Sequence, residues 1–221
     1  MNVLIHQRID RPSPAVVEAA RALEVPDLCD VLGKVAAMDV GIKPLDPAMP
    51  RLVGPAFTVK VPPGDNLMVH YAIHLGDPGD VIVVAAEGDP HYAMGGGNVF
   101  AYAKHRGLGG FVVDGVVRDL RPLRALGLPV LARGVVPFPG AKHGPGAINV
   151  AVSCGGVCVR PGDLVVGDEE GVVVIPLELA EAVVRQARER AAANEQAAQD
   201  IQAWGERHRQ TIEAAVRQLQ A

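Results

Sequence analysis

The sequence predicts an α/β fold, with a layered core of short strands and helices and a long C-terminal helical tail. Short runs rich in valine and isoleucine are bounded by glycine and proline, which is typical of strands. Helical stretches alternate with these runs between residues 66 and 133, which indicates right-handed crossovers and a largely parallel sheet. All 18 prolines and every glycine except Gly205 lie at or before Pro176, so the last part of the chain should be helical.

The elements can be placed in order along the chain. We expect helices over residues 15–23, 27–32, 67–75, 99–106 and 120–126. We expect strands over residues 56–61, 81–86, 111–116, 130–133, 148–153, 157–160, 164–166 and 172–175. Several strands are apolar throughout and should be covered on both faces. The strands after residue 148 follow one another too closely for crossover helices, so we expect an antiparallel or barrel-like extension there.

The chain divides into an α/β domain over residues 1–176 and a helical tail over residues 177–221. One face of the tail carries small or apolar residues at helical spacing: Val184, Ala187, Ala191, Ala198, Ile201 and Trp204. A helix of this length is longer than the body can cover. We therefore expect the tail to pack on a neighbouring subunit of a homo-oligomer.

Composition excludes several classes of protein. The 221 residues are 49% hydrophobic but only 4% aromatic, so the core must consist of aliphatic side chains. The 21 basic and 25 acidic residues give a net charge of −4, which argues against a broad nucleic-acid-binding face. No apolar run approaches the roughly 20 residues that cross a bilayer, so no membrane partner is expected. The three cysteines form no paired framework, which predicts a reduced, cytoplasmic chain.

Two segments contain residues suited to chemistry. Gly95, Gly96 and Gly97 precede Asn98 and Val99 at the start of an expected helix, whose free N–H groups suit a carboxylate or phosphate. Arg118 and Asp119 follow an expected buried strand and open the next helix. In open α/β sheets, sites form at such carboxyl ends of strands.

Each segment also has a purely structural interpretation. The glycines could form a tight turn, and Asp119 could be a plain helix N-cap with Pro122 in the first turn. His70 and His74 have metal-ligand spacing but lack a third ligand, so we interpret them as packing or surface residues. Taken together, a helix N-terminus, a guanidinium and a carboxylate could bind a small oxo-acid and one divalent metal.

Seven blocks of sequence, in order, resemble the RraA-like family, which includes class II 4-hydroxy-4-methyl-2-oxoglutarate / 4-carboxy-4-hydroxy-2-oxoadipate aldolases and the regulator of ribonuclease activity A. The blocks are RLVGPAFTV (51–59), PPGDNL (62–67), PGDVIVV (78–84), VVDGVVRD (112–119), PVLARG (129–134), SCGGV (153–157) and RPGDLVVGDEEGVVVIP (160–176). The resemblance implies a core similar to the phosphohistidine swivelling domain. It also implies a homotrimer or a dimer of trimers, with sites between subunits.

The resemblance also implies roles for individual residues. Asp119 would ligate Mg²⁺ or Mn²⁺, and Arg118 would face the keto oxygen of the substrate. Gly96, Gly97, Asn98 and Val99 would form the cradle for its carboxylate, held by the backbone N–H groups of Asn98 and Val99. A glutamate from an adjacent subunit would complete the catalytic set; Glu195 is the nearest tail residue by position, and Glu189 is the other one.

The expected function is that of a divalent-metal-dependent lyase that cleaves a small 2-oxo acid to pyruvate. Its reactions would be retro-aldol cleavage of a 4-hydroxy-2-oxo diacid, decarboxylation of oxaloacetate, or both. The sequence departs from the aldolase pattern at Gly97, where those enzymes carry an acidic residue. Decarboxylation should therefore survive better than aldol cleavage. The alternatives are a non-catalytic regulatory trimer that binds another protein, and an enzyme acting on another small acid.

Overall fold

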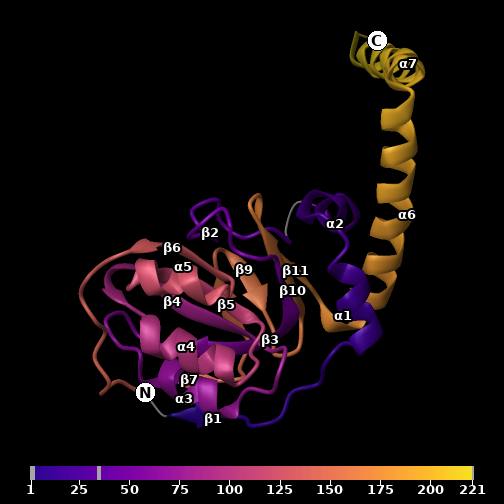
Figure 1. Ribbon diagram of the computed structural model, residues 1–221. Coiled ribbons are helices and arrows are strands. Elements are labelled where there is room, and N and C mark those ends of the chain that lie inside the picture. The colour runs from indigo at the N-terminus through magenta and orange to yellow at the C-terminus, as the bar shows by residue number, and fades with distance from the viewer. Residues whose placement is uncertain (1–2, 34–35, 221) are drawn as a thin grey trace.

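The computed structural model describes residues 3–33 and 36–220, and its elements alternate as an α/β protein requires (Figure 1). The strands are β1 (Leu4–Ile5), β2 (Lys43–Pro44), β3 (Leu52–Lys60), β4 (Val81–Ala93), β5 (Gly110–Val117), β6 (Val130–Val135), β7 (Ala147–Ile148), β8 (Val152–Cys154), β9 (Val157–Val159), β10 (Leu164–Asp168) and β11 (Gly171–Ile175). The helices are α1 (Pro14–Ala20), α2 (Val25–Leu32), α3 (Leu67–Leu75), α4 (Gly97–His105), α5 (Leu120–Leu126), a 3₁₀ turn η1 (Leu177–Leu179), α6 (Ala180–Gln199) and α7 (Ile201–Gln220).

The centre of the sheet is parallel. β3, β4, β5 and β6 are neighbours in that order, and each pairs with the next in parallel. β10 pairs antiparallel with both β3 and β11, and β8 and β9 form a separate antiparallel pair. The expected parallel sheet and its antiparallel extension are therefore confirmed.

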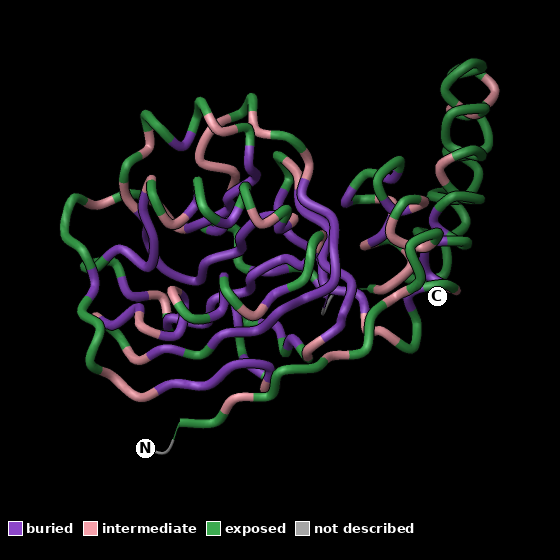
Figure 2. The backbone as a smooth tube through the Cα atoms, turned by 60° about the horizontal axis from the view of Figure 1, so that its bottom comes forward, coloured by how far each residue is buried: buried purple, intermediate pink, exposed green. Residues whose placement is uncertain are grey.

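Three apolar clusters cover these strands, which are buried along most of their length (Figure 2). The first lies between the sheet and α3, α4 and α5, around Phe57, Phe100 and Phe111. The second fills the space between the opposite face of the central strands and β8 to β11. The third joins α1, α2 and the first half of α6 to β10 and β11. Aliphatic side chains dominate all three, as the low aromatic content predicts.

Most expected elements lie where the sequence predicts them, but β3 begins four residues earlier than expected and β4 continues to Ala93 instead of ending at residue 86. Three further differences are corrections. Helices α3 and α5 match their expected ranges at both ends. The expected strand over residues 148–153 is two short strands, because Asn149 adopts a left-handed backbone conformation (φ 57°) that interrupts extended structure. Two-residue strands β1 and β2 were not predicted, since such short segments carry no periodicity. The tail is two helices rather than one.

The break in the tail lies at Asp200. Its φ of −128° and ψ of 72° end α6, and its carboxylate accepts a hydrogen bond from Ala203 N (3.0 Å), which caps α7. Val184 and Ala187 are buried against this chain's own body, whereas Ala198, Ile201 and Trp204 are exposed. Packing of the tail on a neighbouring subunit stays a prediction.

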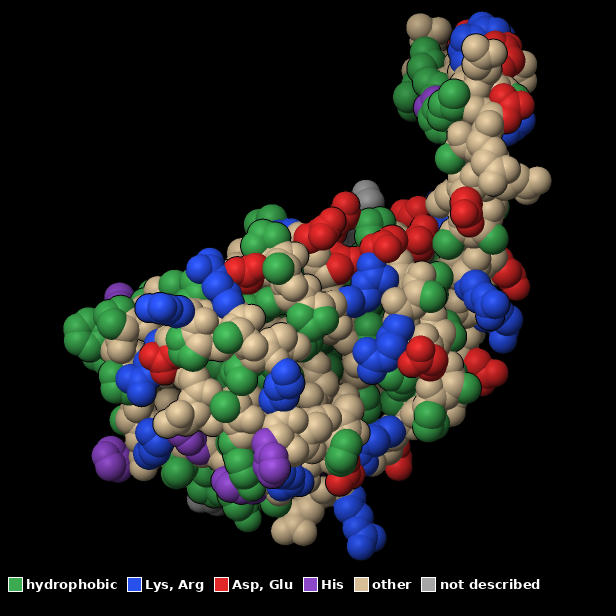
Figure 3. All heavy atoms as spheres, in the orientation of Figure 1, with side chains coloured by type: hydrophobic (Ala, Val, Ile, Leu, Met, Phe, Trp, Pro, Cys, Tyr) green, Lys and Arg blue, Asp and Glu red, His purple; other side chains and the backbone are tan. Residues whose placement is uncertain are grey.

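The outer helix α7 carries an apolar stripe. Ile201, Trp204, Ile212, Val216 and Leu219 recur at helical spacing and are exposed, and the ring of Trp204 stacks on His208 (4.6 Å between centroids). Figure 3 shows apolar side chains gathered on one side of this helix with a histidine among them.

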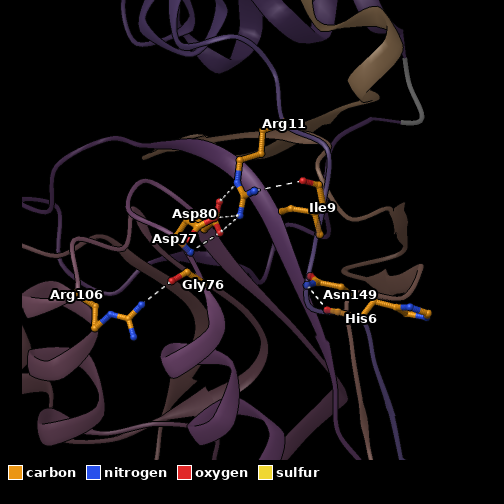
Figure 4. A network of polar contacts seen from close by, with 8 residues as sticks. All are labelled: His6, Ile9, Arg11, Gly76, Asp77, Asp80, Arg106 and Asn149. Carbon is orange, nitrogen blue, oxygen red and sulfur yellow. Dashed lines mark hydrogen bonds and ion pairs between the residues drawn. The ribbon is translucent and has the colours of Figure 1, made fainter.

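An ion-pair network ties the N-terminal segment to the edge of the body (Figure 4). The Arg11 guanidinium donates to both oxygens of Asp80 at 2.8 Å and lies 2.9 Å from Asp77. Asp80 is fully buried, so its charge depends on this partner and on the N–H group of Asp77. The network holds the segment between β1 and α1 against the turn before β4.

Candidate functional site

Four consecutive connections meet at one edge of the sheet and enclose a cavity of about 190 Å³. They are the turns that follow β3, β4, β5 and β6, all at the carboxyl ends of parallel strands. The lining residues are Asn66, His70, Ala93, Gly95, Gly96, Asn98, Val99, Arg118, Asp119, Pro139 and Lys142. The two segments singled out by the sequence therefore lie together, in a cavity sized for a small molecule rather than a drug-sized one.

Asp119 holds an unusual backbone conformation at the start of α5. Its φ of 63° and ψ of 45° lie in the left-handed region, which is uncommon for residues other than glycine. Asp119 occupies the N-cap position of α5, as the structural interpretation expected, but its side chain makes no capping bond to that helix. Instead Asp119 Oδ2 accepts a hydrogen bond from Gly97 N–H (2.9 Å) and lies 3.6 Å from Arg118 Nε. The strained turn thus directs the carboxylate to the N-terminus of a different helix, α4.

The glycine turn before α4 allows this close approach. A Cβ atom on Gly96 would lie 2.6 Å from Asp119 Oδ2 and 3.0 Å from Arg118 Nε, so a side chain there would displace both groups. Arg118 N–H donates to the Gly95 carbonyl (3.0 Å), which fastens the two turns together. Asn98 and Val99 occupy the first turn of α4, where helices present N–H groups without intrahelical acceptors.

Positive charge dominates the lining. Arg118 and Lys142 supply two cations, and the N-terminus of α4 adds the positive end of its dipole. Burial lowers the pKa of His70, and the nearby charges of Lys142, His74 and Arg118 lower it further. The single carboxylate in the lining is that of Asp119. This balance suits a small anion.

Three lining residues with polar or charged side chains, Asn66, His70 and Lys142, were not among the predicted site residues. Asn66 is buried after β3, and its amide donates to the Ala93 carbonyl (3.0 Å). Its Oδ1 finds no donor among the residues that the structure describes. His70, interpreted as packing or surface, is half-buried and lines the cavity, whereas His74 is exposed. The turn after β3 carries Asn66 and could have been identified by the rule that drew attention to Arg118. No sequence feature indicated Lys142, which lies seven residues beyond the end of β6.

Glu195 does not lie near this cavity within the chain. It is exposed on α6 and lines a groove with α1, beside Ala19 and Arg188. Glu189 is also exposed on α6. A role for either residue in a neighbouring subunit's site stays a prediction.

The lining of this cavity offers a divalent metal one protein carboxylate, so water and substrate would supply its other ligands. Within residues 3–33 and 36–220, no three His, Cys, Asp or Glu side chains group closely enough to form an all-protein metal site. Mg²⁺ commonly keeps several waters and binds through one or two carboxylates together with its substrate. Asp119 is half-exposed at the cavity and supplies the hard oxygen ligand that this mode requires.

Comparison with known proteins places the chain in a family. The model of the RraA-like family, described as Aldolase/RraA, matches residues 25–174. The chain belongs to the RraA-like family. A relative from Halalkalibacterium halodurans, named as a candidate 4-hydroxy-4-methyl-2-oxoglutarate aldolase, is 46% identical over 173 residues, which cover 77% of this chain and 82% of the relative.

Solved structures of RraA-like proteins share the fold. Streptomyces coelicolor RraAS2, described as an unusual member of the RNase ES inhibitor RraA protein family, superposes with a TM-score of 0.76. The two are 31% identical, and the match covers 85% of this chain and 98% of that one. The RNA-processing inhibitor RraA of Thermus thermophilus matches with a TM-score of 0.64 and 31% identity, over 69% of this chain and 92% of that one.

No helix within the described ranges combines the length and apolar character that crossing a membrane requires.

Proposed function

We propose that this RraA-like protein is a divalent-metal-dependent lyase that breaks a carbon–carbon bond of a small 2-oxo acid and releases pyruvate. The observation that carries the proposal is the meeting of Arg118, Asp119 and the N-terminus of α4 in one small cavity. The relatives named for 4-hydroxy-4-methyl-2-oxoglutarate aldolase support the same reaction class.

Different residues of the cavity bind different parts of the substrate. The N–H groups of Asn98 and Val99 bind its carboxylate at the positive end of α4. Asp119 holds the metal, which when bound supplies Lewis-acid stabilisation of negative charge on the keto oxygen. Arg118 donates hydrogen bonds to that oxygen and is held in place by the bond from its own N–H to Gly95. Lys142 adds a second cation for a distal carboxylate of a diacid.

The substrates are a 4-hydroxy-2-oxo diacid, by retro-aldol cleavage, and oxaloacetate, by decarboxylation. Retro-aldol cleavage requires a base for the hydroxyl proton, whereas decarboxylation does not. Gly97 provides no side chain where the aldolase pattern has an acid, so decarboxylation should be the faster reaction.

A screen of pyruvate release tests the proposal. Oxaloacetate and 4-hydroxy-4-methyl-2-oxoglutarate are incubated with the protein and Mg²⁺ or Mn²⁺, and pyruvate is followed by coupled NADH oxidation. We expect turnover that disappears with a chelator and returns with either ion. Asp119→Asn should abolish the metal-dependent turnover. Failure of both substrates with both ions would refute the lyase.

A non-catalytic regulator is the second candidate. It is favoured by Gly97 and by two solved neighbours, one described as a member of the RNase ES inhibitor RraA family and the other as an RNA-processing inhibitor. The discriminating measurement is calorimetry with oxalate, a small chelating dianion, in the presence of Mn²⁺. The lyase should bind it with an affinity that depends on Arg118. A protein that binds neither metal nor oxalate would favour the regulator.

A further inference from the structure

The proposed lyase needs a proton acceptor for aldol cleavage, and the residues of the cavity limit which group can serve. Its titratable lining residues are His70, Arg118, Asp119 and Lys142. The guanidinium of Arg118 and the ammonium of Lys142 are hydrogen-bond donors without an acceptor atom. Asp119 already accepts the Gly97 N–H and is the proposed metal ligand. Within this chain's own lining, the imidazole of His70 is the group that remains.

From this placement we infer that His70 is the general base for aldol cleavage, an inference that rests on the proposed function. His70 lies in the first turn of α3, where its backbone N–H donates to the Asn66 carbonyl (3.1 Å). Its side chain is half-buried in the cavity wall. His74, one turn further along the same helix, is exposed and packs on Tyr102 with 5.1 Å between ring centroids. Of these two histidines on α3, only His70 lines the cavity.

The surroundings of His70 suit a base. The charged groups around it are Lys142 from the connection after β6, Arg118 from the end of β5 and His74 on its own helix. Burial, together with these groups, holds the pKa of His70 below its ordinary value of 6.5. The imidazole is therefore neutral at pH 7 and has a free nitrogen to accept a proton. Asp119, the carboxylate of the same cavity, pairs with Gly97 N–H and Arg118 instead.

The step balances without a further reactant. His70 takes the proton of the C4 hydroxyl as the C3–C4 bond breaks, and the hydroxyl oxygen becomes a carbonyl. The electron pair of the broken bond passes to C3 and on to the keto oxygen, giving pyruvate enolate beside Arg118. The enolate then takes a proton at C3 from solvent, and the imidazolium releases its proton to solvent. In decarboxylation the leaving group is CO₂, so His70 has no proton to accept.

The test compares His70→Asn with the matched control His74→Asn, using the full-length protein with Mg²⁺ and both substrates. We expect His70→Asn to lower kcat for aldol cleavage by about 10²–10⁴-fold. Oxaloacetate decarboxylation should stay within a few-fold of wild type, and His74→Asn should leave both reactions unchanged. In the wild type, kcat/KM for aldol cleavage should fall tenfold per pH unit below the pKa of His70, and this acid limb should be absent from decarboxylation.

A second readout does not depend on turnover. Proton NMR of the imidazole resonances in the metal-free protein, assigned by the signal missing from His70→Asn, should show His70 titrating below 6.5 and shifting when oxalate is added. Equal loss of both reactions in His70→Asn, or full retention of both, would overturn the inference while leaving the lyase in place. A wild type that cleaves neither substrate would instead overturn the proposed function and the inference with it.

Discussion

At the scale of single residues, the site depends on one strained backbone and one missing side chain. The left-handed conformation of Asp119 turns its carboxylate towards α4, and the absence of a Cβ on Gly96 leaves room for it. Neither feature can be inferred from residue type alone, because an aspartate after a strand is normally a helix cap. The sequence singled out Arg118, Asp119 and the glycine turn as candidate site residues, and the structure shows how they meet.

Loss of Arg118 should remove catalysis and spare the fold. Arg118→Ala deletes a preorganised donor to the developing oxyanion, which is worth about 3–4 kcal/mol, or about 10²–10³ in kcat. Its half-exposed side chain contributes little to packing, so the melting temperature should barely change. Steady-state pyruvate release measures the effect, and Arg121→Ala, an exposed arginine on α5, is the control. Turnover unaffected by Arg118→Ala would contradict the assignment.

Introducing an acid at position 97 should strengthen metal binding. A Cβ there would lie 3.3 Å from Pro122 Cγ and 3.5 Å from Asp119 Cβ, so a side chain fits with a small adjustment. Gly97→Asp would place a second carboxylate beside Asp119 and should tighten Mn²⁺ binding by about tenfold, because affinity rises with the number of charged ligands. Calorimetry with Mn²⁺ measures it. If the uncharged control Gly97→Asn binds equally tightly, charge is not the reason.

At the scale of elements, the connection after β6 is held over the cavity by a carboxylate from another turn. Asp65 Oδ2 accepts hydrogen bonds from His143 N (2.7 Å) and Gly144 N (2.8 Å), and Oδ1 accepts one from Leu67 N (2.9 Å). Asp65 thereby fixes the start of α3 and the segment that carries Lys142. Asp65 and the segment that carries Lys142 are almost eighty positions apart in the sequence. Sequence spacing therefore gave no indication that Lys142 lies at the cavity.

Asp65→Asn should destabilise the protein and flatten its acid sensitivity. Burial acts to raise the pKa of Asp65, but the three N–H groups outweigh it and hold the pKa below its ordinary value. The unfolded chain therefore binds this proton at higher pH, so the wild type should lose stability as pH falls through about 4 and below. Whichever way the amide of the variant turns, its nitrogen faces at least one of these three N–H groups, which should cost about 1–3 kcal/mol at pH 7.

Urea denaturation at pH 7 and at pH 4 measures both effects. Exposed Asp10→Asn is the control and should follow the wild type at each pH. An Asp65→Asn protein as stable as the wild type at pH 7 would show that these hydrogen bonds do not anchor the connection.

The accuracy of the element predictions followed the strength of the local signal. Helices α3 and α5 have the expected bounds at both ends, and residue types that mark helix ends flank them: Asn66 and Asp119 at the N-cap positions, and Gly76 and Gly127 at the C-cap positions. The break at Asp200 was missed because the apolar spacing continues across it, from Ala198 to Ile201 and Trp204. The first half of α6 has buried residues, whereas the described residues of α7 include none. Such burial depends on tertiary packing, which the apolar spacing along the sequence does not reveal.

At the scale of the whole molecule, the N-terminal segment should be a source of stability. Arg11→Ala would leave the fully buried Asp80 with only the N–H group of Asp77 as a partner. Loss of the charge-assisted bonds should lower the free energy of unfolding by about 1.5–3 kcal/mol. Urea denaturation checks this value against Arg8→Ala, an exposed arginine of the same segment. Equal stability of the two variants would show that the network contributes nothing.

The apolar stripe of α7 should mediate assembly. A chain ending at Asp200 removes the stripe and should form a smaller oligomer than the full chain, as measured by light scattering after gel filtration. Trp204→Glu with Ile212→Glu should act like the truncation, because both residues lie on the stripe. Gln202→Glu with Gln210→Glu adds the same charge off the stripe and is the control. An unchanged mass in the truncated chain would show that the tail makes no contact between subunits.

The enclosure of the cavity by four separate turns has a consequence for divergence within the family. The strands that stabilise the protein end where the turns begin, so a turn can change its side chains while the sheet keeps its packing. Gly97, where the resemblance to the aldolases implies an acidic residue, would be one such change. Relatives named for an aldolase and neighbours described as inhibitors can therefore share a scaffold even if the side chains of these turns differ.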